Sequence, residues 1–534
     1  MSSNRRAALM VLALLSLFFH AAVASAQSPL VFDWVETYDG GAGFDDLPLS
    51  AGVDTGGKFR VSGYAYGDYP NADGFGLLIG DIDAGVASPD VDELVVFSDT
   101  GADAAYGVAS NGWVSAAFSM LLDGRFYVYA YFGDGDPDNW GTVFAGPPSG
   151  LAAAQALALP TSEQAIYATG FATGSDAEDV ITAKYDDEGN ELWSKVYNGA
   201  GDDEDRGLMI RNAPGGGVVV GGYATASDGD KDLLILRYAS NGNILDEVVY
   251  NGGMDADFTL VFLDVAPDGT VYAGYNAFAA ATLQGSGVVT VDDGGTVDEW
   301  SGGRPSLKMT AGCVGCDPFN PPADLAADGV SAVRLAYSGV LAKALADDIL
   351  LTGSSLDGTE LWSAEYAGPG AGADSALSIA GYGGLTAAAG FQKGAEGDTD
   401  AVALIVDHTD AAEGADLTPY LADVSGDLMG AADLAYDIAL FANFTPGGAL
   451  VVTTSHSGTS TGLDVGVLRY DVNLDPGPDD DDDDDDVSDD DAGDDDASDD
   501  DAGDDDAADD DASSDDDAAG DDDADSEDSG GCCG

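Results

Sequence analysis

The sequence is poor in positive charge. Its 534 residues include 17 Lys and Arg against 99 Asp and Glu, which gives a formal net charge of −82. Residues 479–528 hold 32 of the acidic residues and no Lys or Arg, so the rest of the chain still carries −50. Nucleic acids and anionic membranes bind to basic surfaces, and this composition therefore argues against both as partners. Adaptation to salt accounts for such a charge more simply than a specific cation-binding role.

Histidine is also scarce. Only His408 and His456 follow the apolar N-terminal segment. A histidine-dependent catalytic triad or a multi-histidine metal centre therefore has almost no residues to draw on, and we predict no catalytic residues.

The four cysteines form two local pairs, Cys313 with Cys316 and Cys532 with Cys533. In an exported protein, the first pair predicts a short-loop disulfide. Zinc is the weaker alternative, because a four-thiolate site needs a second pair at suitable spacing within the fold.

A long apolar run occurs only at the N-terminus. Residues 7–23 follow Arg5 and Arg6 and precede Ala24-Ser25-Ala26, which has the small-x-small form of a signal-peptidase site. We expect residues 1–26 to be a signal peptide that is cleaved after Ala26. The mature chain is then secreted or held at the cell surface without a transmembrane segment. A retained N-terminal anchor is the alternative.

Two sequence signatures recur along residues 27–473. The first is an apolar run ending in Gly and an aromatic residue, with weaker copies at Ala117-Phe118 and Ala336-Tyr337 and a degenerate copy at residues 451–455. The clear copies are Gly63-Tyr64, Gly170-Phe171, Gly222-Tyr223, Gly274-Tyr275 and Gly390-Phe391. Successive aromatic positions, weak copies included, lie 52 to 62 residues apart. The second signature, aromatic-x-Gly, precedes the first at nearly the same period, as at Tyr197-x-Gly199. Two signatures that keep step indicate one repeated structural unit.

The clearest unit begins at Asp179. It contains four short β-rich runs separated by turn residues such as Glu188-Gly189-Asn190 and Pro214-Gly215-Gly216. Four strands in about 50 residues are typical of one β-propeller blade. This unit and the next, from Asp232, resemble the secreted bacterial β-propeller-repeat proteins. The resemblance implies the fold and an exported setting, but no single activity.

The two ends of the repeat region are complementary. The segment Phe32-Asp33-Trp34 matches the second strand of the unit that begins at Asp179, so the first strand of its own unit is missing. Residues 464–471 supply that strand after the last unit. Pairing of the two ends would close a ring and remove exposed strand edges. We therefore predict an all-β propeller of eight four-stranded blades, with seven blades or an open solenoid as alternatives.

Residues 474–534 form a separate segment. A run of eight Asp is followed by repeated Asp-Asp-Asp-Ala-Gly and Asp-Asp-Asp-Ala-Ser pentads, and the chain ends in Gly-Gly-Cys-Cys-Gly. Because like charges repel and there is little apolar surface to bury, we predict a disordered polyanion that gathers cations along its length.

One loop has the spacing of a partial calcium site. Asp134, Asp136 and Asp138 alternate as in a calcium-binding loop, but Asn139 and Ala145 stand where its Gly and closing Glu belong. Ca²⁺ is therefore the one cofactor that the sequence suggests. The Asp residues that open successive units, at 179, 232, 348, 400 and 464, are better explained as turn or strand-start residues than as ligands.

Three tryptophans, Trp34, Trp193 and Trp362, occupy matching places in their units, and we expect them to pack between neighbouring blades. With no catalytic cluster predicted, we expect a non-enzymatic extracellular scaffold that binds a protein or a glycan and is projected by the acidic tail. The alternatives are a carboxylate-dependent enzyme acting on extracellular polysaccharide, as a lyase or hydrolase, and a calcium-stabilised structural protein of the cell surface.

Overall fold

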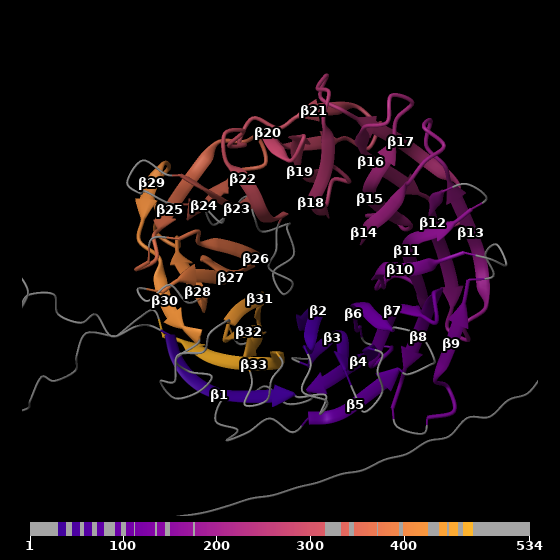
Figure 1. Cartoon of the computed structure of the whole chain (residues 1–534), viewed down its shortest axis with the longest axis horizontal. Helices are drawn as coiled ribbons and strands as arrows, with labels where there is room; N and C mark the ends of the chain where they lie inside the picture. Colours follow the sequence, from indigo (N-terminus) through magenta and orange to yellow (C-terminus); the bar gives the residue numbers. More distant parts are fainter. Residues whose placement is uncertain are drawn as a thin grey trace, which may run out of the picture. The chain divides into compact units, whose positions relative to one another are not determined.

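The protein is a ring of eight sheets, seen in a computed structural model (Figure 1). The residues that it describes are 30–38, 45–53, 58–66, 72–79, 91–97, 103–111, 113–133, 136–144, 150–174, 177–314, 333–340, 347–370, 372–394, 399–424, 437–445, 448–457 and 463–473. The predicted signal peptide and acidic tail lie outside these ranges. Within them, no helix is long and apolar enough to cross a membrane.

Blades 1 to 4 follow the chain from the centre of the ring outward. Their strands are β2 (Leu47–Val53), β3 (Phe59–Tyr66), β4 (Ala72–Ile79) and β5 (Val91–Phe97) in blade 1; β6 (Ala104–Ala109), β7 (Ala116–Leu122), β8 (Arg125–Tyr131) and β9 (Trp140–Val143) in blade 2; β10 (Ala152–Ala158), β11 (Ala165–Thr173), β12 (Glu178–Asp186) and β13 (Glu191–Tyr197) in blade 3; and β14 (Arg206–Asn212), β15 (Val218–Thr225), β16 (Lys231–Tyr238) and β17 (Ile244–Tyr250) in blade 4.

Blades 5 to 8 keep the same order. Their strands are β18 (Asp257–Val265), β19 (Val271–Ala279), β20 (Thr282–Val291) and β21 (Val297–Glu299) in blade 5; β22 (Lys308–Val314), β23 (Val333–Val340), β24 (Asp347–Ser354) and β25 (Glu360–Tyr366) in blade 6; β26 (Ser375–Tyr382), β27 (Leu385–Lys393), β28 (Thr399–Asp407) and β30 (Tyr420–Asp423) in blade 7; and β31 (Asp437–Phe444), β32 (Leu450–Ser457), β33 (Leu463–Val472) and β1 (Leu30–Tyr38) in blade 8. The short strand β29 (Ala415–Leu417) adds a parallel edge to blade 6.

The two ends of the ring pair with each other, as the sequence predicts, but they form the third and fourth strands of blade 8 and not the first and second strands of a blade. Strand β1 is the outermost strand and lies antiparallel to β33, with Trp34 opposite Arg469. Arg469 is almost fully buried and forms ion pairs with Asp33 on β1 and, at 2.7 Å, with Asp471. The innermost strands β31 and β2 also contact each other across the join. The prediction of an eight-bladed closed ring is confirmed, and the seven-bladed and open alternatives are wrong.

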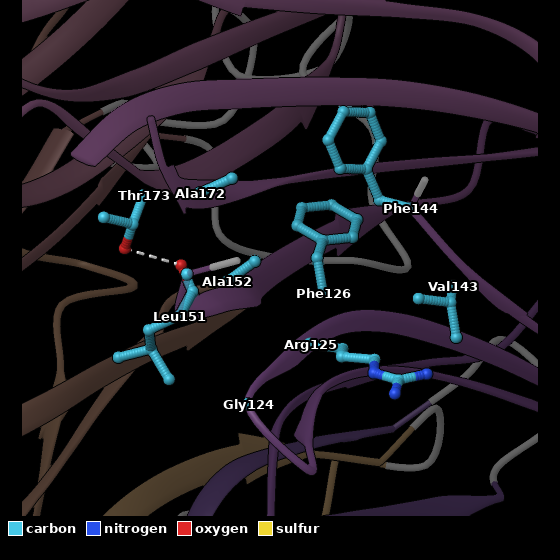
Figure 2. A pocket seen from close by; sticks show the side chains of 10 residues that line it. Gly124, Arg125, Phe126, Val143, Phe144, Leu151, Ala152, Ala172 and Thr173 are labelled. Atoms are coloured by element: carbon cyan, nitrogen blue, oxygen red, sulfur yellow. Dashed lines mark hydrogen bonds between the residues drawn. The ribbon is translucent and has the colours of Figure 1, made fainter. Parts of the chain in front are cut away.

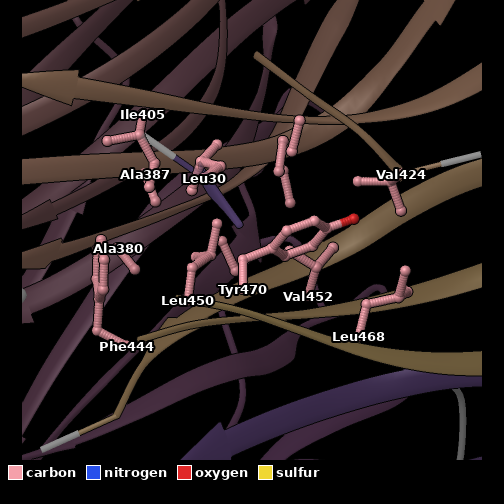
Figure 3. Close-up of a cluster of buried hydrophobic side chains, with 14 of the residues drawn as sticks. Leu30, Ala380, Ala387, Ile405, Val424, Phe444, Leu450, Val452, Leu468 and Tyr470 are labelled. Carbon is pink, nitrogen blue, oxygen red and sulfur yellow. The ribbon is translucent and has the colours of Figure 1, made fainter. Parts of the chain in front are cut away.

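The hydrophobic core is divided among the blade interfaces. Eight clusters of buried apolar side chains occur among the described residues, one at each junction between neighbouring blades. Figure 3 shows the cluster between blades 7 and 8, where Phe444 and Tyr470 of blade 8 pack near Ala387 and Ile405 of blade 7. Because both faces of every blade are covered by its neighbours, no blade buries its core alone.

Each innermost strand carries a β-bulge at an equivalent place. One residue is skipped in its pairing with the second strand of every blade. The skipped residues are Leu49, Tyr106, Gln155, Leu208, Val261, Thr310, Leu377 and Leu440. A bulge bends its strand, and its repetition eight times gives the inner strands a common geometry around the ring.

The bulge explains the recurring glycine of the first sequence signature. Gly222 pairs with Gly207, the residue before the bulge, and a Cβ on Gly222 would lie 1.9 Å from the carbonyl oxygen of Arg206. A Cβ on Gly170 would approach the carbonyl oxygen of Ala153 as closely. The second strand therefore requires glycine where a carbonyl oxygen of the innermost strand, next to the bulge, points at its backbone.

The bulge also corrects part of the repeat alignment. Gly63, Gly170, Gly222 and Gly390 share one register position, but Gly274 and Ala336 face the residue after the bulge. Ala117 pairs with Ala109, well beyond the bulge. The steps on either side of Ala117 therefore compare different positions of the second strand, whereas the 62-residue step joins the equivalent positions Gly274 and Ala336.

Tryptophan side chains form hydrogen bonds from three of the blades to the next blade in the ring. Trp140, Trp193 and Trp300 each donate the indole N–H to a carbonyl oxygen in the turn between the third and fourth strands of the next blade, at 2.8, 3.0 and 2.9 Å. The acceptors are Asp187, Ser240 and Leu356.

Two of these rings also lie against a turn glycine. Gly189 and Gly242 have φ of +83° and +81°, and a Cβ there would lie 2.7 and 2.8 Å from the indoles of Trp140 and Trp193. Both the left-handed backbone and the close ring exclude a side chain at these positions.

Trp34 and Trp362 are buried, and Trp193 is half-buried against blade 4. All three lie in or against the apolar clusters between neighbouring blades. The prediction that these tryptophans pack between blades is confirmed.

Replacing Trp193 with Ala should lower the free energy of unfolding by about 2–3 kcal/mol, because it removes ring packing and an inter-blade hydrogen bond together. Trp193→Phe should cost about 1 kcal/mol, since it removes the N–H donor and keeps most of the packing. Equilibrium unfolding in denaturant measures both. The neighbouring Leu192→Ala is the matched control, because Leu192 is 54% exposed. Equal losses for Trp193→Ala and Leu192→Ala would contradict the inter-blade role of the indole.

Candidate functional site

The ring presents two faces to ligands. If the strands of a blade are called A to D from the centre outward, the A–B and C–D connections lie at one edge of each sheet, and the B–C and D–A connections at the other. We call these the AB/CD face and the BC/DA face. Two of the described cavities lie between blades 2 and 3, one on each face.

The predicted calcium loop lies on the AB/CD face, between β8 and β9. Asp134 falls outside the described residues. The Asp136 carboxylate accepts the backbone N–H of Asp138 at 2.9 Å, which makes a local turn. Asn139 closes the loop by accepting the N–H of Phe132 and donating to the carbonyl of Gly133, both at 2.7 Å. The loop is thus held by its own hydrogen bonds, and calcium binding by it stays a prediction.

Beside this loop is a cavity of about 350 Å³, here called the acidic-aromatic pocket. Its aromatic side chains are Trp113, Phe132 and Trp140, all half-buried. Its carboxylates are Asp138 from blade 2 and Asp187 and Glu188 from the C–D turn of blade 3, all exposed. The structure therefore brings one residue of the predicted calcium loop next to two acidic residues that the sequence did not single out.

The C–D turn of blade 3 concentrates negative charge. Asp186, Asp187 and Glu188 place one carboxylate oxygen each within 4.8 Å of one another. A hydrogen bond shared with Asp187, and then the negative charges of Asp187 and Asp186, raise the pKa of Glu188 above its ordinary value. The Trp140 indole fixes this turn through the carbonyl oxygen of Asp187.

A second cavity, of about 320 Å³, lies on the BC/DA face (Figure 2). Phe126 and Phe144 line it with their rings 5.9 Å apart, and the exposed side chain of Arg125 lies at its rim. Its backbone edge is tied together by Leu151, whose carbonyl oxygen accepts both the N–H and the hydroxyl of Thr173 at 2.8 Å.

A network of paired charges covers the BC/DA face at blades 3 and 4. Glu204 accepts hydrogen bonds from Lys231 at 2.7 Å and Tyr223 at 2.7 Å, and it pairs with Arg206 at 3.0 Å. Arg206 also pairs with Glu178. These contacts outweigh the effect of burial and lower the pKa of Glu204. Each of these charges therefore has a protein partner, which is typical of a structural ion-pair network.

Carboxyl groups with a raised pKa serve as loop clamps. Asp205 and Asp374 each precede the innermost strand of a blade and are 0% and 1% exposed. Asp205 accepts the N–H of Gly199 and, at 2.7 Å, that of Thr225. Asp374 accepts the N–H of Gly368 at 2.6 Å in the same way. Burial raises the pKa of both carboxyls, although the backbone N–H groups oppose the shift.

This clamp accounts for two copies of the second sequence signature, at Gly199 and Gly368, where the glycine is the N–H donor. A Cβ on Gly199 or Gly368 would come within 2.8 Å of the clamping carboxylate. Asp46 and Asp103 are buried before the innermost strands of blades 1 and 2. The sequence signal for this clamp is an Asp directly ahead of the innermost strand of a blade, which neither of the two recurring signatures includes.

The strand-opening aspartates behave as the sequence predicts. Asp179, Asp232, Asp348, Asp400 and Asp464 are each the second residue of the third strand of their blades. Asp73 of blade 1 holds the same position and was missed. Burial, and then the charge of Asp205, raise the pKa of Asp179.

His408 and His456 are both buried. His408 stacks on Trp362 with ring centroids 5.0 Å apart, and its Nε2 lies 3.1 Å from the hydroxyl of Thr386. Burial, and then the positive charge of Arg334, lower the pKa of His408 to about 3. Burial lowers the pKa of His456 to about 4. Both imidazoles are therefore neutral at physiological pH, packed within the blades.

Cys313 lies buried on β22, and Cys316 falls outside the described residues. The predicted disulfide between them stays a prediction.

Comparison with protein-family models gives no match, and comparison with curated proteins by sequence gives none. Solved structures of similar shape include a protein of unknown function from Dyadobacter fermentans, with 11% identity, a TM-score of 0.38, and coverage of 83% of this chain and 99% of that one. The polysaccharide lyase Uly1 has 11% identity, a TM-score of 0.37, and coverage of 83% and 100%. Puromycin hydrolase has 13% identity and a TM-score of 0.41, and the match covers 81% of this chain and 62% of the hydrolase. Likenesses this weak carry no argument about function.

The stability of the ring should fall in acid through its histidines. Folded His408 stays neutral down to a pKa of about 3, whereas the unfolded residue binds a proton near 6.5. The contribution of neutral His408 to the free energy of unfolding is therefore fully present above pH 6.5. It is lost as the pH falls below that value, and the free energy of unfolding is lower by about 2 kcal/mol at pH 5.

Unfolding of the wild type and of His408→Gln at pH 7 and pH 5 measures this contribution. Because glutamine does not titrate, the difference in unfolding free energy between the two proteins should shrink by about 2 kcal/mol at the lower pH. Parallel pH dependences would contradict the burial of a neutral imidazole.

Proposed function

We propose that the chain is a secreted or cell-surface, non-enzymatic binding scaffold, whose propeller loops contact an extracellular protein or glycan and whose acidic tail projects the ring. The observation that carries the proposal is the blade 2–3 junction, where aromatic and polar side chains line a cavity on each face. Hydrogen bonds between and within the blades hold both cavities in shape. Preformed cavities of this kind favour binding without a large ordering cost.

The chemistry of the described carboxyl groups favours binding over catalysis. Asp205 and Asp374 have a raised pKa but are buried and occupied by backbone N–H groups, and Glu188, whose pKa is also raised, lies exposed in an acidic turn. The acidic groups that line the acidic-aromatic pocket are exposed, as a recognition surface requires. The proposed exported setting rests on the N-terminal segment and on the resemblance to secreted propeller-repeat proteins.

The mature chain, when immobilised and exposed to an extracellular protein extract, should retain a partner in a saturable way. In a second experiment, the soluble chain is applied to a glycan array, where binding to a glycan partner should also saturate. The same preparation should leave extracellular polysaccharides intact when their chain length is followed over time. Cleavage of a polysaccharide that persists through purification, and is lost with a substitution of a surface carboxylate, would support the alternative of a carboxylate-dependent lyase or hydrolase instead.

Calcium stabilisation is a second proposal, favoured by the convergence of Asp186, Asp187 and Glu188. Carboxylate oxygens are preferred ligands of Ca²⁺, although an exposed trio offers fewer of them than a complete site. If Ca²⁺ holds this turn, adding a chelator should lower the melting temperature of the wild type and leave that of Glu188→Gln unchanged. An identical melting temperature with and without chelator would exclude a stabilising ion.

A further inference from the structure

The acidic-aromatic pocket is lined by aromatic and by acidic side chains. Trp113 and Phe132 lie with ring centroids 6.0 Å apart at an angle of 45°, and Trp140 completes the aromatic wall. The acidic side chains come from both blades, since Asp138 belongs to blade 2 and Glu188 to blade 3. The pocket therefore exists only because the two blades are packed together.

The blade contact fixes the acids beside the rings. The Trp140 indole N–H donates to the carbonyl oxygen of Asp187 at 2.8 Å, and the same ring lies against Gly189. The turn that carries Asp187 and Glu188 is thus held against the aromatic wall. A ligand that uses both surfaces meets them already in place.

The charge of the lining is of one sign. Among the described residues that line the pocket, three are acidic and none is Lys or Arg. A positive charge that approaches Asp187 and Glu188 relieves the repulsion between these carboxylates, which adds to the effect of the Asp187 hydrogen bond in raising the pKa of Glu188. An anionic ligand would add to that repulsion, in a chain that already carries −82.

The aromatic wall distinguishes between kinds of cation. A bare divalent ion prefers oxygen ligands and gains little from a ring, whereas an alkyl ammonium or guanidinium group gains from both carboxylates and ring faces. The cavity volume of about 350 Å³ admits a group of that size with part of its alkyl chain.

We infer that the acidic-aromatic pocket binds an organic cation, an ammonium or guanidinium group on an alkyl chain, between the rings of blade 2 and the carboxylates of Asp187 and Glu188. This inference rests on the proposed binding function and names the chemistry of its ligand. The group can come from a free amine or from a basic side chain of a partner protein.

Ligand-detected NMR and calorimetry on the full mature chain test the inference with n-pentylammonium. A monovalent probe is chosen because the acidic tail attracts polyamines without specificity. Pentylammonium should bind saturably at about millimolar affinity, as a few weak contacts allow, and 1-pentanol and pentanoate should not. Capped Gly-Lys-Gly compared with pentylammonium shows whether the pocket favours a peptide side chain or a free amine.

The double substitution Asp187→Asn and Glu188→Gln should weaken pentylammonium binding by about tenfold, because both carboxylates are lost while their shapes remain. Both residues are exposed, so folding is expected to be retained. Asp298→Asn is the control, since Asp298 is also exposed and lies on β21 in blade 5. Trp113→Ala should weaken binding severalfold by removing part of the wall.

Equal binding of pentanol, or pentylammonium binding that the double substitution leaves unchanged, would overturn the inference. Such a result would leave the proposed scaffold function standing if the chain still retains an extracellular partner. Enzymatic turnover of a polysaccharide would overturn the scaffold function whether or not the amine binds.

Discussion

The antiparallel pairing of β1 with β33 is the contact on which the rest of the structure depends. It joins residues from the two ends of the ring, with Trp34 opposite Arg469, and it completes blade 8. Every blade buries its apolar faces against two neighbours, so an unclosed ring would expose one face of blade 1 and one of blade 8. Arg469 links the two ends of the ring, because its buried guanidinium pairs with Asp33, and removing Asp33 would take a carboxylate partner away from a buried charge.

Closure also determines where binding chemistry can lie. In a closed ring the blades cannot shift independently, so side chains at a junction keep fixed relative positions. At the blade 2–3 junction, Trp140 connects β9 to the turn at Asp187, and the acidic-aromatic pocket forms around that contact. The acidic-aromatic pocket is therefore a property of two adjacent blades, and no single repeat contains it.

The sequence predicted the ring well because closure and blade number leave periodic signals. Asp464 and Trp34 have clear counterparts in other blades, and they identified the two halves of blade 8. The bulges escaped detection because Leu49, Gln155 and Thr310 share no chemical feature; their position follows from strand pairing alone. The sequence predicts part of the acidic-aromatic pocket, because the spacing of Asp138 indicates a calcium ligand. The nearness of Asp138 to Glu188 is not predicted, because it depends on packing between two blades that no local spacing encodes.

The role of β33 can be tested most directly by comparing the thermal unfolding of residues 27–473 with that of residues 27–462. The first chain removes only the acidic tail, and the second also removes β33. We predict that the first unfolds cooperatively at the temperature of the mature protein, and that the second loses its cooperative transition. Cooperative unfolding of both chains at the same temperature would contradict a ring held closed by the pairing of its two ends.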